Sequence, residues 1–180
     1  EKAFMSEIKK KMDNAELGQM TEAENTLEEA KFILDNVATE DIEIDKLFEK
    51  GANPKSEKKA VNVKRNRIEA AKLNEKSFNL IYEACESRIG KLKFQDKDRQ
   101  VKAKDLRNQA SEKMTNATTK GDDYKYLEDK DLEQFPYADL KSKIESTNDL
   151  FKEALVNEFD AWKHYFDQFN ADGSPVEAAP

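Results

Sequence analysis

The chain has 180 residues, of which 37% are hydrophobic and 38% are charged. This balance favours an elongated helical bundle, in which each helix needs only one apolar stripe, over a compact sphere. Five Gly and four Pro are too few for the turns of an all-β fold, and a net charge of -7 argues against nucleic acid as a partner.

The first predicted element covers residues 3–37, where apolar stripes with steps of three and four residues lie on either side of Gly18. Gly18 is typical of a helix C-terminus, and Thr21 with Glu24 has the spacing of a capping box. The segment is therefore either a hairpin of two short helices or one long helix with a weak point.

Part of this segment also resembles a single tetratricopeptide repeat. The residues that carry the resemblance are Leu17, Gly18, Leu27, Ala30, Leu34 and Val37. No second copy follows at the expected period of about 34 residues, so the sequence predicts no repeat array.

Residues 38–59 are predicted to connect this segment to the next helix. Within them, a short helix that covers one end of the bundle is expected from Ile42, Ile44, Leu47 and Phe48. Gly51, Asn53 and Pro54 would end it, and Ser56 would cap the next helix.

The helix that follows is predicted to run from Ser56 to about Leu92 and carries two neighbouring stripes. One stripe consists of Ile68, Ala71, Phe78, Cys85, Ile89 and Leu92, and the other of Ala70, Leu73, Ser77, Ile81 and Ala84. Because two stripes need two neighbours, we expect this helix at the centre of the bundle.

After a predicted turn at residues 94–100, a third helix is expected to end near Gly121. Its narrow apolar face suits a close approach to the central helix: Val101, Leu106, Ala110, Met114 and Ala117. The acidic stretch after Gly121 is predicted to contain a short helix, which Pro136 ends. Pro136 also starts the last helix, residues 137–169.

The last helix carries the only Trp and the only His of the chain. One face is predicted to hold Leu140, Ile144, Thr147, Phe151, Leu155, Phe159, Trp162, Phe166 and Phe169. Three consecutive steps of four within it act as a stutter, which locally unwinds a supercoil. His164 points away from Trp162 and is predicted to face solvent between Asp160 and Asp167.

Composition excludes several chemistries. A single His excludes a di-iron site with two Glu-x-x-His motifs, and zinc would need Cys and His clusters that are missing. Cys85 lies on an apolar stripe and is interpreted as a core residue rather than a nucleophile. We therefore predict no enzyme activity, no cofactor and no metal site.

Residues 54–67 form the most basic segment, and its candidate partner-binding cations are Lys58, Lys59, Lys64, Arg65 and Arg67. Their partner is either internal, in the acidic residues 39–45 or 122–133, or external. An external partner would be an acidic protein face or an anionic envelope polymer.

Together these features predict an all-α protein with one bundle domain at residues 1–170 and a flexible tail at residues 171–180. The bundle would have three long helices and a helical N-terminal segment. No apolar run approaches the roughly 18 residues of a membrane span. Because the chain starts at Glu1, export to the periplasm or cell surface is the expected location, with the cytoplasm as the open alternative.

The predicted function is that of a non-enzymatic interaction or scaffold protein, an accessory subunit of a multi-subunit or envelope complex. It would dock through the basic segment and through an aromatic helix end formed by Phe159, Trp162, Tyr165, Phe166 and Phe169. The alternative is a periplasmic holdase-like chaperone or carrier of apolar clients. A third hypothesis, an enzyme that uses the region around Trp162, would depend on His164.

Overall fold

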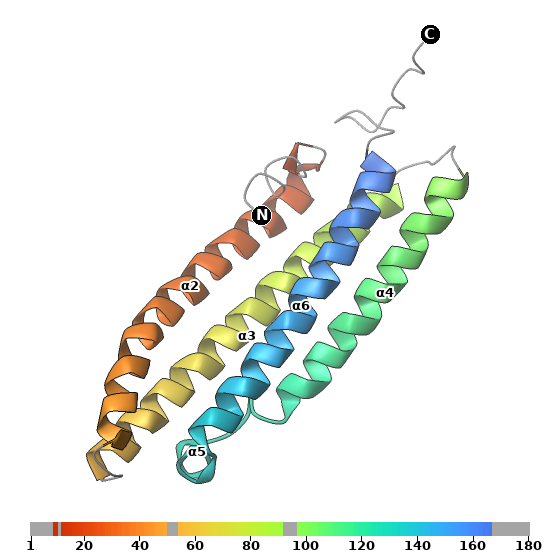
Figure 1. Cartoon of the computed structure of the whole chain (residues 1–180). Helices are drawn as coiled ribbons and strands as arrows, with labels where there is room; N and C mark the ends of the chain where they lie inside the picture. The colour runs from red at the N-terminus through yellow and green to blue at the C-terminus, as the bar shows by residue number, and fades with distance from the viewer. Residues whose placement is uncertain (1–8, 11, 50–53, 92–96, 167–180) are drawn as a thin grey trace.

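The computed structural model describes residues 9–10, 12–49, 54–91 and 97–166, which form helices and no strand, so the predicted all-α fold is confirmed. The helices are α2 (Asn14–Glu49), α3 (Pro54–Lys91), α4 (Lys97–Asp122), α5 (Asp129–Gln134) and α6 (Tyr137–Phe166). The four long helices lie side by side in an elongated bundle, in the spatial order α2, α3, α6 and α4 (Figure 1).

Some predicted features lie outside the described residues. They are the first predicted helical residues, 3–8, part of the predicted turn, 94–96, and the C-terminal tail, 171–180. The rest of that turn, 97–100, is instead the start of α4, so the turn was predicted too long.

Helix α2 begins at an acidic capping box. Asp13 Oδ1 accepts hydrogen bonds from the N–H groups of Ala15 (3.2 Å) and Glu16 (3.3 Å), and Glu16 Oε2 accepts one from Asp13 N–H (3.2 Å). Gly18 and Thr21 lie inside the helix, so the alternative with a break at Gly18 and a cap at Thr21 is not formed. Of the two alternatives, the structure has one long helix, and it runs through the stretch that resembles a tetratricopeptide repeat.

The same helix also continues through most of the predicted connection, 38–59. The short helix expected there is instead the last part of α2, because neither Gly nor Pro interrupts the sequence before the helix ends. Ion pairs Asp41–Arg67 and Glu43–Lys59 tie these last turns to α3. The prediction of a separate connection was wrong, because α2 continues without a break to Glu49.

Helix α3 lies at the centre of the bundle, as its two stripes predicted. On one side, Phe78 packs against Phe151 of α6, with ring centroids 5.3 Å apart. On the other side, the hydroxyl of Ser77 donates a hydrogen bond to the backbone carbonyl of Ala23 in α2 (2.7 Å). The helix begins at Pro54, slightly before the predicted cap at Ser56, because Pro is well suited to a first helical turn.

Buried small side chains spaced seven residues apart line both antiparallel pairs, α2–α3 and α4–α6. In the first pair they are Ala23, Ala30 and Val37 with Val63, Ala70, Ser77 and Ala84. In the second pair they are Ala103, Ala110 and Ala117 with Thr147, Ala154 and Ala161. A seven-residue spacing keeps one face of each helix against its partner, as in a coiled coil.

Helix α4 packs chiefly against α6 and not, as predicted, against the central helix. Its buried face follows the seven-residue frame of Ala103, Ala110 and Ala117, so Val101 falls outside that face and is 69% exposed. Met114 still reaches Phe78 of α3, in a cluster shared with α6.

The packing face of α6 differs from the prediction in its second half. Its buried residues are Leu140, Ile144, Thr147, Phe151, Ala154, Glu158 and Ala161. These steps alternate strictly between four and three, so the predicted stutter is absent. The prediction put Leu155 and Phe159 on the packing face because they are apolar. In the structure both are half-buried, at the edge of the face that contacts α4.

Candidate functional site

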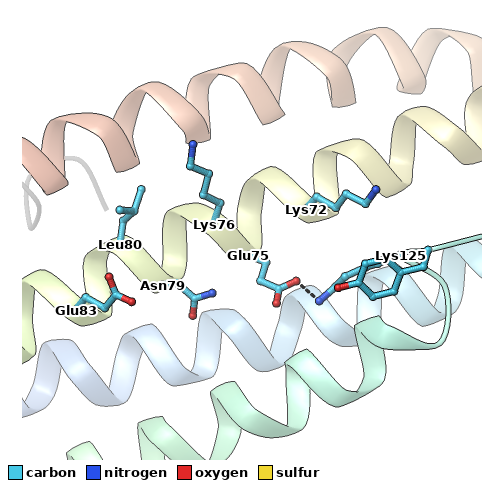
Figure 2. A pocket seen from close by; sticks show the side chains of 8 residues that line it. Lys72, Glu75, Lys76, Asn79, Leu80, Glu83 and Lys125 are labelled. Carbon is cyan, nitrogen blue, oxygen red and sulfur yellow. Dashed lines mark ion pairs between the residues drawn. The ribbon is translucent and has the colours of Figure 1, made fainter.

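A pocket of about 550 Å³ lies along one face of α3 (Figure 2). Six of its lining residues recur at helical spacing on α3, and two come from the segment that follows α4. They are Lys72, Glu75, Lys76, Asn79, Leu80, Glu83, Lys125 and Tyr126. Five of these eight side chains are lysines or glutamates, although most of the surface that lines the pocket is apolar.

Lys125 is the buried member of this set, with only 5% of its surface exposed. Its ammonium group forms an ion pair with Glu75, and Figure 2 shows the two side chains pointing toward each other. The Lys125 Nζ atom also lies 5.9 Å from the centre of the Phe151 ring. A side chain at Gly121 would overlap the Lys125 side chain, so the glycine makes room for the buried lysine.

Burial lowers the pKa of Lys125 to about 8, because the charged amine loses hydration. The Glu75 carboxylate acts in the opposite direction by favouring the charged amine. Lys72 and Lys76 line the same pocket but are exposed, and they pair with Glu69 (3.5 Å) and Glu22 (3.3 Å) respectively. Lys125 is therefore chemically distinct from the other two lysines.

A second unusual group is the fully buried carboxyl of Glu158 on α6. Neither of its oxygens has a hydrogen-bond partner among the described residues, and Arg107 Nε of α4 is 3.9 Å from Oε1. Burial raises the pKa of Glu158 to about 7, an effect that Arg107 opposes and Glu86 adds to. Glu158 is therefore a group that titrates near neutral pH inside the bundle.

Other polar groups lie close to Glu158. Arg107 forms a second ion pair, 3.0 Å long, with Glu86 of α3. Burial raises the pKa of Tyr82, and its hydrogen bond with Ser111 of α4 opposes the shift. The three helices α3, α4 and α6 thus form a small polar network at the edge of the bundle, of which Glu158 is the buried member.

Most cations of the predicted basic segment have internal partners. Arg65 Nε donates a hydrogen bond to Asp129 Oδ1 (2.8 Å), which raises the pKa of Arg65. Arg67 pairs with Asp41, and Lys59 with Glu43, as described above. These partners come from both acidic segments that the internal alternative named.

Lys64 is buried, and its ammonium group donates hydrogen bonds to two backbone carbonyls near α5. One is that of Leu132 (2.6 Å), and the other is that of Phe135. Burial lowers the pKa of Lys64. Lys58 remains exposed on the first turns of α3.

The predicted aromatic helix end is only partly covered by the structure. Phe159 is half-buried and packs against the cluster that contains Ala103 and Ala161. The side chains of Trp162, Tyr165 and Phe166 and the whole of Phe169 lie outside the described residues. The structure therefore leaves this docking surface a prediction.

The two remaining candidate residues, Cys85 and His164, both lie within helices of the bundle. Cys85 is buried in the core, as predicted, and His164 is half-buried rather than fully facing solvent. Within the described parts of the chain, no group of His, Cys, Asp and Glu could hold a metal ion. None of the described helices has an apolar stretch long enough to cross a membrane.

The sequence interpretation missed both Lys125 and Glu158. For Glu158 a signal existed, since it follows Ile144 and Phe151 at intervals of seven residues, but polarity took it off the predicted face. For Lys125 the only local signal is Gly121 one helical turn earlier. The partner, Glu75, is far away in sequence, so only the fold brings the two together.

The sequence matches no known protein-family model, no curated protein is significantly similar to it, and no solved structure resembles it at a significant level.

Proposed function

We propose that this chain is a non-enzymatic interaction protein that presents the outer face of α2 to a protein partner. The observation that supports this proposal is a pair of large apolar side chains that α2 exposes away from its contact with α3. Phe32 is 69% exposed and Ile42 is 59% exposed, and Thr39 is exposed between them. At 100° per residue, these three residues fall within an arc of about 80° on the helix.

The surroundings of this exposed pair suggest the chemistry of the partner. Phe32 lies about 180° around the helix from Ala23, a residue of the buried seam, so its ring points away from the bundle. Several exposed residues near Phe32 on α2 are acidic: Glu28, Glu29 and Asp35. A complementary partner would offer an apolar pocket or stripe with Lys and Arg at its edges, as helix-in-groove complexes do.

The two docking surfaces predicted from sequence remain part of the proposal. The aromatic end of α6 would extend the contact area at the far end of the bundle. The basic segment is the weaker of the two, because Lys59, Lys64, Arg65 and Arg67 would have to exchange their internal partners for an external one. For this reason we place the main contact on α2.

The test is site-specific photo-crosslinking in cells that make the protein. A photoreactive residue at position 32 is compared with one at position 101, because Phe32 and Val101 are both 69% exposed and lie on different helices. We expect a discrete crosslinked partner from position 32 only, and we expect Phe32→Asp to abolish its copurification. A monomeric protein without a crosslinked partner at position 32 or along α6 would contradict the proposal.

The holdase alternative needs an apolar groove for clients. The described pocket has a mostly apolar surface but also five lysine and glutamate side chains, so it is not the continuous apolar groove that this alternative needs. Strong binding of a hydrophobic dye to the native protein would favour the holdase over a docking protein. Export to the periplasm or cell surface also remains a proposal, and fractionation of the source cells tests it.

A further inference from the structure

Two buried polar atoms at the edge of the bundle lie near each other without a hydrogen bond. They are Nε of Arg107 on α4 and Oε1 of Glu158 on α6, and the distance between them is 3.9 Å. Neither atom has a hydrogen-bond partner among the described residues. Because a charge-assisted hydrogen bond of this kind is about 2.7–2.9 Å long, the two atoms are about 1 Å too far apart to form one.

The guanidinium of Arg107 is held near Glu158 by a second carboxylate. Its Nη2 atom lies 3.0 Å from Oε1 of Glu86 on α3. A guanidinium carries five N–H donors, so the Nε–H group can bond to Glu158 while Nη2 keeps its contact with Glu86. Arg107 therefore lies between a carboxylate on α3, whose side chain is 52% exposed, and a fully buried carboxyl on α6.

The protonation state of Glu158 decides how strongly it attracts Arg107. A carboxylate that is enclosed without hydrogen bonds loses its hydration, which favours the neutral form. The charges that act on Glu158 come from the two helices packed against α6: Arg107 of α4 favours the ionised carboxyl, and Glu86 of α3 opposes it. Tyr82, also on α3, is a further titratable neighbour. The neutral carboxyl thus attracts Nε weakly, and the ionised carboxyl attracts it strongly.

We propose that Glu158 and Arg107 form a proton-controlled clamp between α6 and α4. With the proton bound, the 3.9 Å gap stays open and Arg107 ties α4 to α3 alone. When the proton leaves, the carboxylate draws the Arg107 Nε–H group into a hydrogen bond. The guanidinium then joins three helices through two carboxylates. This inference is independent of the proposed docking through the outer face of α2.

The clamp changes state by an acid–base step that needs no other reactant. The O–H bond of Glu158 breaks, and its proton passes to water, which reaches the network at its exposed edge, beside Glu86. Burial raises the pKa of Glu158 to about 7. The carboxyl is therefore mostly neutral and the clamp open below pH 7, whereas the clamp is closed at higher pH.

The first measurement follows both groups in the wild-type protein by NMR between about pH 5.5 and pH 9. We expect the Glu158 carboxyl carbon and the Arg107 Nε–H signal to change with one midpoint near pH 7, and the Nε–H proton to move downfield as the pH rises. Arg65 is the matched control, because its Nε–H already bonds to Asp129 (2.8 Å) and its signal should stay constant. In Glu158→Gln the Arg107 signal should stay constant as well.

Two variants should shift the pKa of Glu158 in opposite directions. Arg107→Lys keeps the positive charge, but its single nitrogen cannot occupy the positions of Nε and Nη2 together, so the pKa should rise by at least about one pH unit. Glu86→Gln removes a repelling charge and leaves Nε in place, so the pKa should fall. Circular dichroism establishes that both variants fold.

Two results would overturn the clamp. One is an Arg107 Nε–H signal that stays constant in the wild-type protein while Glu158 titrates. The other is an unchanged Glu158 pKa in folded Arg107→Lys, which would mean that positive charge alone, and no hydrogen bond from Nε, acts on the carboxyl. The first result needs no variant, so the proposal can fail even where a substitution disturbs folding.

Discussion

The two antiparallel pairs, α2–α3 and α4–α6, have similar seams but differ in one buried polar group on each seam, Ser77 and Glu158. Both pairs pack through small side chains seven residues apart. In α2–α3 the buried hydroxyl of Ser77 donates to the Ala23 carbonyl. In α4–α6 the buried carboxyl of Glu158 has no hydrogen-bond partner among the described residues. Ser77 in the first seam is therefore satisfied, whereas Glu158 at the corresponding kind of position in the second has no hydrogen bond among the described residues.

The difference indicates where this bundle responds to its surroundings. A satisfied hydroxyl contributes to stability at every pH, while a buried carboxyl that titrates near pH 7 makes stability depend on pH. The α4–α6 pair also supplies Lys125, through the segment that follows α4. The two groups with the largest pKa shifts, Lys125 and Glu158, thus lie on α6 and the segment that follows α4, while α3 carries smaller shifts at Lys64 and Tyr82.

The largest effect is expected where the two pairs meet, at Phe151. This ring is 1% exposed and packs against Phe78 of α3, so Phe151→Ala should lower the free energy of unfolding by about 3–5 kcal/mol. Urea denaturation measures the loss. Phe32→Ala is the control, since an exposed ring should contribute less than about 0.5 kcal/mol.

Glu158 should produce the next largest effect, with a sign that depends on pH. Its folded-state pKa of about 7 lies above the ordinary value of 4.5, so the folded state holds the proton more tightly. The contribution of Glu158 to the free energy of unfolding should therefore be greatest below pH 4.5. It should fall by about 3 kcal/mol as the pH rises from 4.5 to the folded-state pKa of about 7.

Glu158→Gln tests this prediction, because the amide is neutral at every pH. We expect the variant to be more stable than the wild type at pH 8 and to lose most of the difference at pH 5, in urea unfolding measured at both values. Charged and polar neighbours on the packed helices, Arg107, Glu86, Tyr82 and Ser111, are unchanged in the variant. Equal pH dependence in both proteins would contradict the assignment.

Ser77→Ala should have the opposite sign in the first pair. It removes the hydrogen bond to the Ala23 carbonyl, and a loss of about 1 kcal/mol is expected at pH 5 and pH 8 alike. Thermal unfolding at the two pH values measures it. A gain in stability would mean that the Ser77 hydroxyl does not stabilise the α2–α3 seam through this hydrogen bond.

The smallest effect concerns Gly18, which lies inside α2 with no atom near the place of a Cβ. Gly18→Ala should raise the free energy of unfolding by about 0.5–1 kcal/mol, because Ala loses less conformational freedom in a helix. If α2 instead ended at Gly18, the substitution would destabilise the protein, so the sign of the change decides between one helix and two.

Sequence periodicity was enough to predict the helical class, the central position of α3, the short α5 and the start of α6 near Pro136. The periodicity of apolar residues failed to predict the structure where charged residues lie within a helix or on its buried face. Thus the last turns of α2 are acidic but helical, and Glu158 is charged but lies on the buried seam. The internal partners of the basic segment were named as one of two alternatives, because charge can be counted in a sequence while distance cannot.

By itself, the sequence determined an all-α bundle with narrow apolar faces, since the spacing of apolar and small residues sets which side of each helix is buried. Only the tertiary structure decided that α4 pairs with α6 and that Lys125 meets Glu75. It also decided that Glu158 is enclosed without a hydrogen-bond partner among the described residues. These outcomes depend on which helices become neighbours, and the same small-residue spacing in every long helix is compatible with more than one pairing.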